Sequence, residues 1–176
     1  MERTPRTLAT LVLALFAALG LAAAPSADAR GNGREHRLDT AILARMNAAR
    51  AAHGLGPLRR NAELAVAARH HSLEMARGGY FAHASADGGS FAGRVREWYS
   101  VVGRRWAVGE NLLWSTPAIG GRQAVDLWLA SPGHRANVLG RAWKDVGCAA
   151  VHVADAPGVY GYQPVTVVTC DFGRRG

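Results

Sequence analysis

Cysteine, lysine and catalytic signature motifs are all scarce in this sequence of 176 residues. Cys148 and Cys170 are the two cysteines, and Lys144 is the one lysine. The chain lacks an HExxH motif, which would place two histidines on one face of a helix, and a GxSxG turn for a serine nucleophile. The cysteines lack CxxC spacing, which disfavours a redox pair or a cysteine-rich metal site. The sequence therefore contains no obvious nucleophile.

Acidic residues are also few, and the formal net charge is +8. The arginines that supply this charge are scattered, without a basic run interleaved with aromatics or a nucleic-acid motif. We expect a solvated basic surface and no specific nucleic-acid partner. Such a surface could adhere to an anionic wall polymer or a lipid surface.

The N-terminus resembles a secretory signal peptide over residues 1–29. Arg3 and Arg6 form a basic start, residues 8–24 are apolar, and Ala27-Asp28-Ala29 fits a cleavage site. This pattern predicts a secreted or envelope-associated protein of bacterial type, cleaved near Ala29. Retention of the apolar stretch as a membrane anchor is the alternative. Residues 30–37 are polar and aperiodic, and we expect a flexible leader there.

The remaining chain alternates helical and strand-like patterns without a strict βαβ order, which favours an α+β domain. Asn61 and Ser90 are suited to cap helices, and the glycines after residue 77 are suited to end one. Pro132-Gly133 is expected to end a helix and to leave His134 at the break. The expected helices begin near residues 38, 62, 91 and 118, and the expected strands cover 108–114, 146–153 and 165–172.

The two cysteines each lie in one of the last two strand-like runs. In an exported protein such a pair indicates a disulfide, here Cys148–Cys170 across a wide hairpin. The bond would stabilise the domain by roughly 2–4 kcal/mol.

Three ionisable residues lie at the ends of expected elements, where a cleft can collect side chains that are distant in sequence. His83, Glu110 and His134 could bind zinc or another divalent cation, or act as a general acid–base set. Nothing in their spacing forces them together, and each could equally have a structural role. Asn111, Ser131 and Asn137 are expected neighbours that orient the histidines.

A rival cluster lies on the second helix. His70 and Glu74 are four residues apart and could pair or bind metal, while His71 falls on the apolar stripe. We interpret this cluster as structural.

Taken in order, four stretches resemble the CAP superfamily, in particular the bacterial SCP-like extracellular branch. The superfamily comprises the cysteine-rich secretory, antigen 5 and pathogenesis-related class 1 proteins. Its likeness to this chain covers residues 38–173, which are expected to form one CAP domain. The stretches are residues 43–50, 76–83, 109–111 and 128–139, with further agreement at 146–148 and 170–173.

The resemblance implies an α-β-α sandwich with a central antiparallel sheet and a cleft lined by two histidines and usually two acids. His83, Glu110 and His134 match three of these positions, whereas Ser131 stands where many relatives have the second acid. We therefore expect a monomeric CAP protein that binds a ligand, a divalent metal or an envelope partner without a defined reaction. A metal-dependent hydrolase of peptide or cell-envelope material, using the same three residues, is the alternative. A mainly adhesive envelope protein is a third.

Overall fold

The computed structural model describes residues 27–176, with side chains from residue 33 onward. The expected signal peptide therefore lies almost wholly outside the described residues. In chain order the helices are α1 (Ala27–Ala52), α2 (Ala62–Gly78), α3 (Phe91–Trp98), α4 (Gly121–Ala130) and α5 (Pro132–Val138). The strands are β1 (Arg59–Arg60), β2 (Trp106–Ser115), β3 (Asp145–Ala156) and β4 (Gln163–Arg175).

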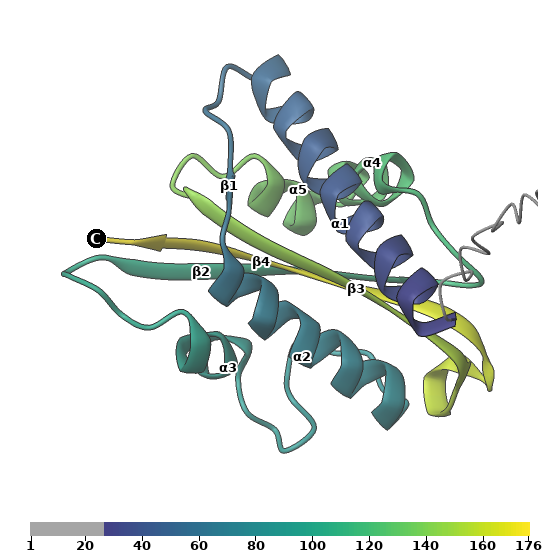
Figure 1. The fold of residues 1–176 in the computed structure, drawn as a ribbon. Helices are drawn as coiled ribbons and strands as arrows, with labels where there is room; N and C mark the ends of the chain where they lie inside the picture. The colour runs from purple at the N-terminus through teal and green to yellow at the C-terminus, as the bar shows by residue number, and fades with distance from the viewer. Residues whose placement is uncertain (1–26) are drawn as a thin grey trace, which may run out of the picture.

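The architecture is an α-β-α sandwich (Figure 1), with the helices α1, α4 and α5 on one face of the sheet and α2 and α3 on the other. The strand order is β1-β3-β4-β2. The three long strands are antiparallel, and the two-residue β1 pairs with the start of β3 in parallel. This arrangement confirms the expected fold class.

Local signals start and end the helices as the sequence indicates. The Asn61 side chain accepts a hydrogen bond from the Leu64 amide, and Ser90 caps α3 through the Gly93 amide. Gly79 ends α2 in the left-handed conformation, with φ 72°.

Two expectations need correction. Residues 30–37, expected as a flexible leader, belong to α1, because its first turns pack against β3 through contacts such as that of Glu35 with the His152 amide. Pro132-Gly133 does not simply end a helix. Pro132 is the first residue of α5, since proline lacks only an N–H that the first turn would leave unpaired.

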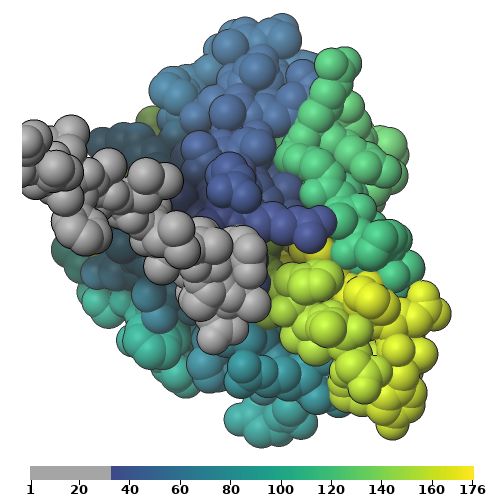
Figure 2. Space-filling model, turned by 45° about the vertical axis from the view of Figure 1, so that its right-hand side comes forward, coloured from purple at the N-terminus to yellow at the C-terminus, as the bar shows by residue number. Residues whose placement is uncertain are grey.

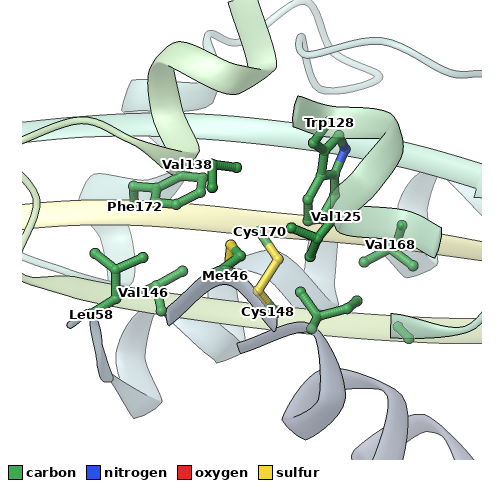
Figure 3. Packing of buried hydrophobic residues seen from close by; sticks show 13 residues of the cluster. Met46, Leu58, Val125, Trp128, Val138, Val146, Cys148, Val168, Cys170 and Phe172 are labelled. Carbon is green, nitrogen blue, oxygen red and sulfur yellow. A yellow bond between two sulfur atoms is a disulfide. The ribbon is translucent and has the colours of Figure 1, made fainter. Parts of the chain in front are cut away.

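The larger core lies between the sheet and the layer of α1, α4 and α5 (Figure 3). Cys148 and Cys170 are register partners on β3 and β4, and their disulfide confirms the expected pairing. Trp128 of α4 is buried beside it. The other members that Figure 3 labels are Met46, Leu58, Val125, Val138, Val146, Val168 and Phe172.

The opposite face packs closely on α2. A Cβ atom at Gly147 would lie 2.0 Å from the Ala65 amide nitrogen, so a residue without a side chain is required there. The Ser72 hydroxyl of α2 donates to the Ala149 carbonyl oxygen of β3. Figure 2 shows the part of α1 that follows residue 32, in purple, beside the yellow-green residues of the β3–β4 turn.

Candidate functional site

The candidate site is built around Glu110 on β2, the strand that forms one outer edge of the sheet. Its side chain is 1% exposed. One carboxylate oxygen, Oε1, lies 2.8 Å from His83 Nδ1, and the other, Oε2, pairs with the Arg94 guanidinium. Both oxygens of this buried acid are thus engaged by basic side chains.

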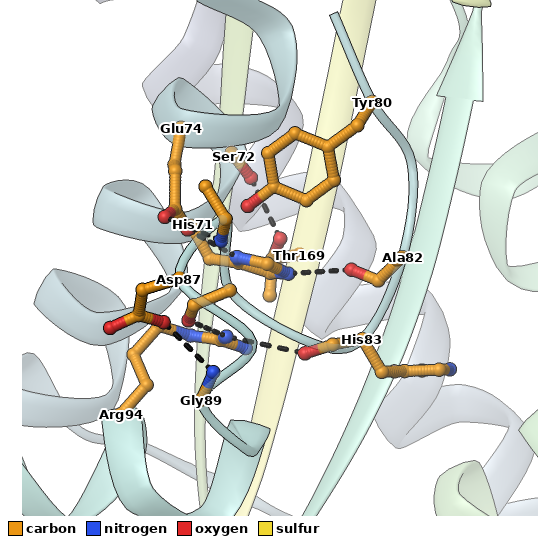
Figure 4. Close-up of polar contacts among 12 residues, drawn as sticks. His71, Ser72, Glu74, Tyr80, Ala82, His83, Asp87, Gly89, Arg94 and Thr169 are labelled. Atoms are coloured by element: carbon orange, nitrogen blue, oxygen red, sulfur yellow. Dashed lines mark hydrogen bonds and ion pairs between the residues drawn. The ribbon is translucent and has the colours of Figure 1, made fainter. Parts of the chain in front are cut away.

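Arg94 of α3 joins the parts of the site together, and Figure 4 shows it beside the loop that carries His83. One guanidinium nitrogen donates to the His83 carbonyl oxygen at 3.2 Å and to Ser85 Oγ at 2.9 Å, while the other reaches Glu110. The same side chain therefore fixes the backbone that carries His83 and the carboxylate that His83 contacts. It is buried, so these bonds are shielded from water.

Arg94 was missed at the level of sequence, where the arginines were interpreted as a solvated surface. A signal was present, because Phe91, Arg94, Val95 and Trp98 share one stripe of a short helix. An arginine within an apolar stripe indicates a buried partner.

His83 presents its other ring nitrogen to solvent. Its side chain is 54% exposed, and the contact with Glu110 uses Nδ1. When Nδ1–H donates to the carboxylate, Nε2 carries the lone pair and is available to a ligand.

His134 lies in the first turn of α5, after Ser131, which is the residue before the helix. Burial lowers the pKa of this histidine, and the nearby charge of His83 lowers it further. His83 contacts Glu110, and the His134 carbonyl oxygen accepts from Asn111, so the two histidines lie at adjacent residues of the edge strand β2. At neutral pH, His134 is therefore an uncharged donor of a lone pair.

An amide network holds α5 against the edge strand. The Asn137 side-chain amide donates hydrogen bonds to the backbone oxygen of Glu110, at 3.0 Å, and to Asn111 Oδ1, at 2.9 Å. Asn111 in turn donates to the His134 carbonyl oxygen at 3.0 Å. The structure thus places Asn111 against the His134 backbone and Asn137 against Glu110 and Asn111, while Ser131 lies at the junction of α4 and α5.

A second buried acid, Asp171 on β4, faces Glu110 in the sheet register. Its carboxyl oxygens contact no hydrogen-bond donor among the described residues. Burial raises the pKa of Asp171 well above its usual range, and the negative charge of Glu110 raises it further. Asp171 was not predicted as a site residue, although an acid that follows a run of Val, Thr and Cys is a signal of a buried carboxyl group.

The rival cluster is differently paired than the sequence suggested. His71, rather than His70, contacts Glu74, at 3.1 Å, and its other ring nitrogen lies 2.9 Å from the Ala82 carbonyl oxygen. His71 is fully buried. Figure 4 shows this ring between Glu74 and the loop that leads to His83, so the pair anchors that loop.

The three expected metal ligands are not gathered as a set of three. Within residues 27–176, no group of three or more His, Cys, Asp or Glu side chains is arranged to hold a metal ion. Glu110 is engaged behind His83, which leaves two imidazoles as the donor set. Such a set fits a borderline ion such as Zn²⁺ with other positions open, so metal binding stays a prediction.

A family model described as "CAP: Cysteine-rich secretory protein family" matches residues 43–172. The chain is 33% identical over 106 residues to the "uncharacterized membrane protein YlbC" of Bacillus subtilis, which covers 60% of this chain and 29% of that protein. Within the described residues, no helix has the length and apolar character needed to cross a membrane.

Solved structures agree on the fold. An extracellular protein containing an SCP domain from Bacillus anthracis superimposes with a TM-score of 0.68 at 27% identity, covering 87% of this chain and 45% of that one. An outer surface protein of Borrelia burgdorferi gives 0.65 at 16% identity, covering 78% and 92%. The chain therefore spans less than half the length of the two Bacillus relatives.

Proposed function

Because the chain belongs to the cysteine-rich secretory protein (CAP) family, we propose that it is an exported binding module without catalytic turnover. Its ligand would bind at the region faced by His83 and His134. Export is supported by the N-terminal pattern of residues 1–29, by the disulfide and by the likeness to an extracellular Bacillus anthracis protein.

The full engagement of Glu110 is the observation that carries this proposal. A general base needs a carboxylate oxygen within reach of the proton that it removes. Here Oε1 contacts His83, Oε2 pairs with Arg94, and the side chain is buried. The carboxylate is therefore suited to orienting the imidazole. Since both cysteines are in the disulfide, no thiol replaces it as a nucleophile.

The ligand class follows from the two imidazoles. His83 Nε2 and the ring of His134 would hold a divalent cation such as Zn²⁺, with Glu110 behind His83 as the carboxylate that fixes its tautomer. A bound cation would supply a positive anchor for an anionic ligand group. The chain's own residues orient the ligands and hold the loop in place.

Zinc titration by calorimetry tests this proposal. We expect micromolar binding to the wild-type protein, and its loss in His83→Ala and in His134→Ala. His70→Ala is the matched control, because His70 is an exposed histidine on α2 outside the site. Binding that survives both site substitutions, or is absent from the folded wild type, would overturn the proposed site.

A metal-dependent hydrolase is the second candidate, and the hydrogen bond from His83 to Glu110 favours it. This contact is the kind that supports metal-bound histidines in catalytic sites. Release of fragments from peptide or purified cell-wall substrate, measured with added zinc and with chelator, separates the two functions. Zinc-dependent release that is lost in His83→Ala would replace the binding module with the hydrolase.

A further inference from the structure

At one end of the sheet the last residues of β2 and the first residues of β4 carry no charged side chains, whereas β3 has the exposed Asp155 next to its last residue. Residues 111–121 and 156–170 contain no Asp, Glu, Lys, Arg or His, although the chain carries a net charge of +8. The two segments lie in contact, because Thr116 Oγ1 donates 2.7 Å to the Pro164 carbonyl oxygen and Thr166 Oγ1 donates 3.3 Å to that of Pro117. Together we call these two uncharged segments the apolar tip.

Large apolar side chains of the tip face solvent. Val159 and Tyr162, on either side of the β3–β4 turn, are 59% and 71% exposed. Trp114 of β2 is also exposed and packs edge-on against Tyr160, with ring centroids 5.3 Å apart. Because Tyr160 lies between Val159 and Tyr162 in the chain, its contact with Trp114 brings β2 beside the β3–β4 turn.

Tyr162 occupies a backbone position that disfavours it. Its φ is 58°, within the left-handed region, and it follows Gly161, which also has a positive φ. Glycine or asparagine is the usual residue in such a conformation, because a Cβ atom there is strained. A strained aromatic residue that is mostly exposed indicates a use for its side chain outside the fold.

Basic residues at the start of α1 lie beside the tip. Arg34 lines a small cavity together with Ala118 and Ile119 of the uncharged segment. Arg34 and Arg37 are exposed, while the neighbouring Glu35 pairs with Arg69. Figure 2 shows the purple residues of α1, which follow residue 32, adjoining the yellow-green turn. In the sequence, the apolar residues 8–24 precede α1, so the chain enters the domain at this end.

We propose that the apolar tip docks on the surface of a lipid bilayer that carries anionic headgroups. Trp114, Val159 and Tyr162 would enter the interfacial layer, where tryptophan and tyrosine are favoured because they are apolar with one polar group. Arg34 and Arg37 would face the headgroup charge. A bilayer fits better than an anionic polymer, because a polymer would require charged or hydrogen-bonding groups where this surface has exposed Val, Trp and Tyr.

The docking surface is separate from the candidate ligand site, and the proposal does not depend on ligand binding there. An experiment that contradicts docking therefore leaves the proposed ligand site intact, and the reverse also holds. His83→Ala should bind vesicles as the wild type does, and variants of the tip should bind zinc as the wild type does.

Fluorescence quenching on vesicles tests the docking. The full chain, recovered after export, is mixed with phosphatidylcholine vesicles with and without phosphatidylglycerol, whose acyl chains are brominated. We expect quenching of Trp114, identified by its loss in Trp114→Phe, and stronger binding with phosphatidylglycerol. Residues 1–29 contain no tryptophan, so the readout reports on the domain whether or not they are retained. Unquenched Trp114 on vesicles would overturn the proposal, and binding to purified cell walls instead would assign the tip to a wall polymer.

Substitutions separate docking from folding. Val159→Asp should weaken binding to vesicles about tenfold, because a charge would enter the apolar layer. Val102→Asp is the matched control, since Val102 is 53% exposed and lies beside the C-terminal residue, Gly176, at the far end of β4. Tyr162→Gly should weaken binding while raising or preserving the melting temperature, because it relieves the left-handed strain. Equal binding by Val159→Asp and Val102→Asp would contradict docking through the tip.

Discussion

β1 pairs only with Asp145 and Val146, so the rest of β3 is an open edge of the sheet, as β2 is on the other side. Side chains cover these two edges in opposite ways. Along β3, carboxylates of α1 accept from the strand: Asp39 from the Ala150 amide at 2.7 Å and Glu35 from the His152 amide at 2.9 Å. Along β2, side chains of α4 and α5 donate to it. Trp128 Nε1 donates 3.0 Å to the Leu112 carbonyl oxygen, and Asn137 donates to that of Glu110.

This difference explains why the candidate site lies at β2. Asn137, which closes the edge, also binds Asn111 and so holds the turn that carries His134. The side chain of Glu110 contacts His83 of the candidate site, while its backbone oxygen accepts from Asn137, which covers the edge. At β3, by contrast, the closing carboxylates bond to backbone amides, and Glu35 also pairs with Arg69. We therefore expect substitutions at β2 to affect binding and stability together, and those at β3 to affect stability alone.

Arg94→Met should produce the largest loss of stability. It would leave Glu110 buried without its strongest ionic partner, and Asp171 beside it, so the free energy of unfolding should fall by about 3–5 kcal/mol. Urea unfolding followed by circular dichroism measures this change. Arg96→Met is the control, because Arg96 lies exposed on the same helix. Equal stability of the two variants would show that the Arg94–Glu110 pair does not support the β2 edge.

Trp128→Phe should have the next largest effect. It removes the donor to the Leu112 carbonyl oxygen and leaves a void in a buried position, at a cost of about 1–3 kcal/mol. The same unfolding series measures it, with Trp98→Phe as the exposed counterpart. Equal stability of Trp128→Phe and Trp98→Phe would show that the hydrogen bond of the Trp128 indole does not stabilise the β2 edge.

The contribution of the β3 edge should instead appear in the pH dependence of the free energy of unfolding. Burial raises the pKa of Asp39 to about 7, even though the bond from Ala150 lowers it. Between these two pKa values, Asp39 stays protonated in the folded state, whereas in the unfolded chain, where its pKa is near 3.9, it has lost its proton. Stability should therefore fall as pH rises from about 4 to 7, by up to about 1.4 kcal/mol per pH unit.

Asp39→Asn keeps an oxygen for the Ala150 amide and stays neutral at every pH. Unfolding free energies measured at intervals between pH 4 and 8 should thus decline less steeply for this variant than for the wild type. Parallel curves for the two proteins would contradict a titrating Asp39.

His83→Ala should have the smallest effect on stability, within about 0.5 kcal/mol, because the imidazole is exposed and Glu110 keeps Arg94. Thermal unfolding measures this. A loss comparable with that of Trp128→Phe would mean that His83 supports the fold rather than a ligand.

Much of the fold could be predicted where the signal is local. Asn61, Ser90 and Gly79 start and end helices through their own side chain or backbone, and the two cysteines lie in patterned strands. The early start of α1 could not be predicted in this way. Its first turns are stabilised by contacts of Glu35 and Asp39 with a strand more than a hundred residues later.

The site was predictable in its residue types rather than its geometry. His83, Glu110 and His134 were found from their positions at element ends and from the family resemblance. The burial of Arg94 and Asp171 depends on the packing of α3 and the register of β2 with β4, which no local pattern contains. That Glu110 supports His83, instead of standing beside it as a third ligand, follows from those two neighbours.

The carboxylates that close β3 also bear on solubility. An open strand rich in Ala and Val, with unpaired amides, is a template on which another chain can add a strand and begin to aggregate. Glu35 and Asp39 occupy two of those amides and place acidic groups along the edge. A protein truncated beyond Glu35 would keep its disulfide and its site, yet would expose part of this edge to other copies of itself.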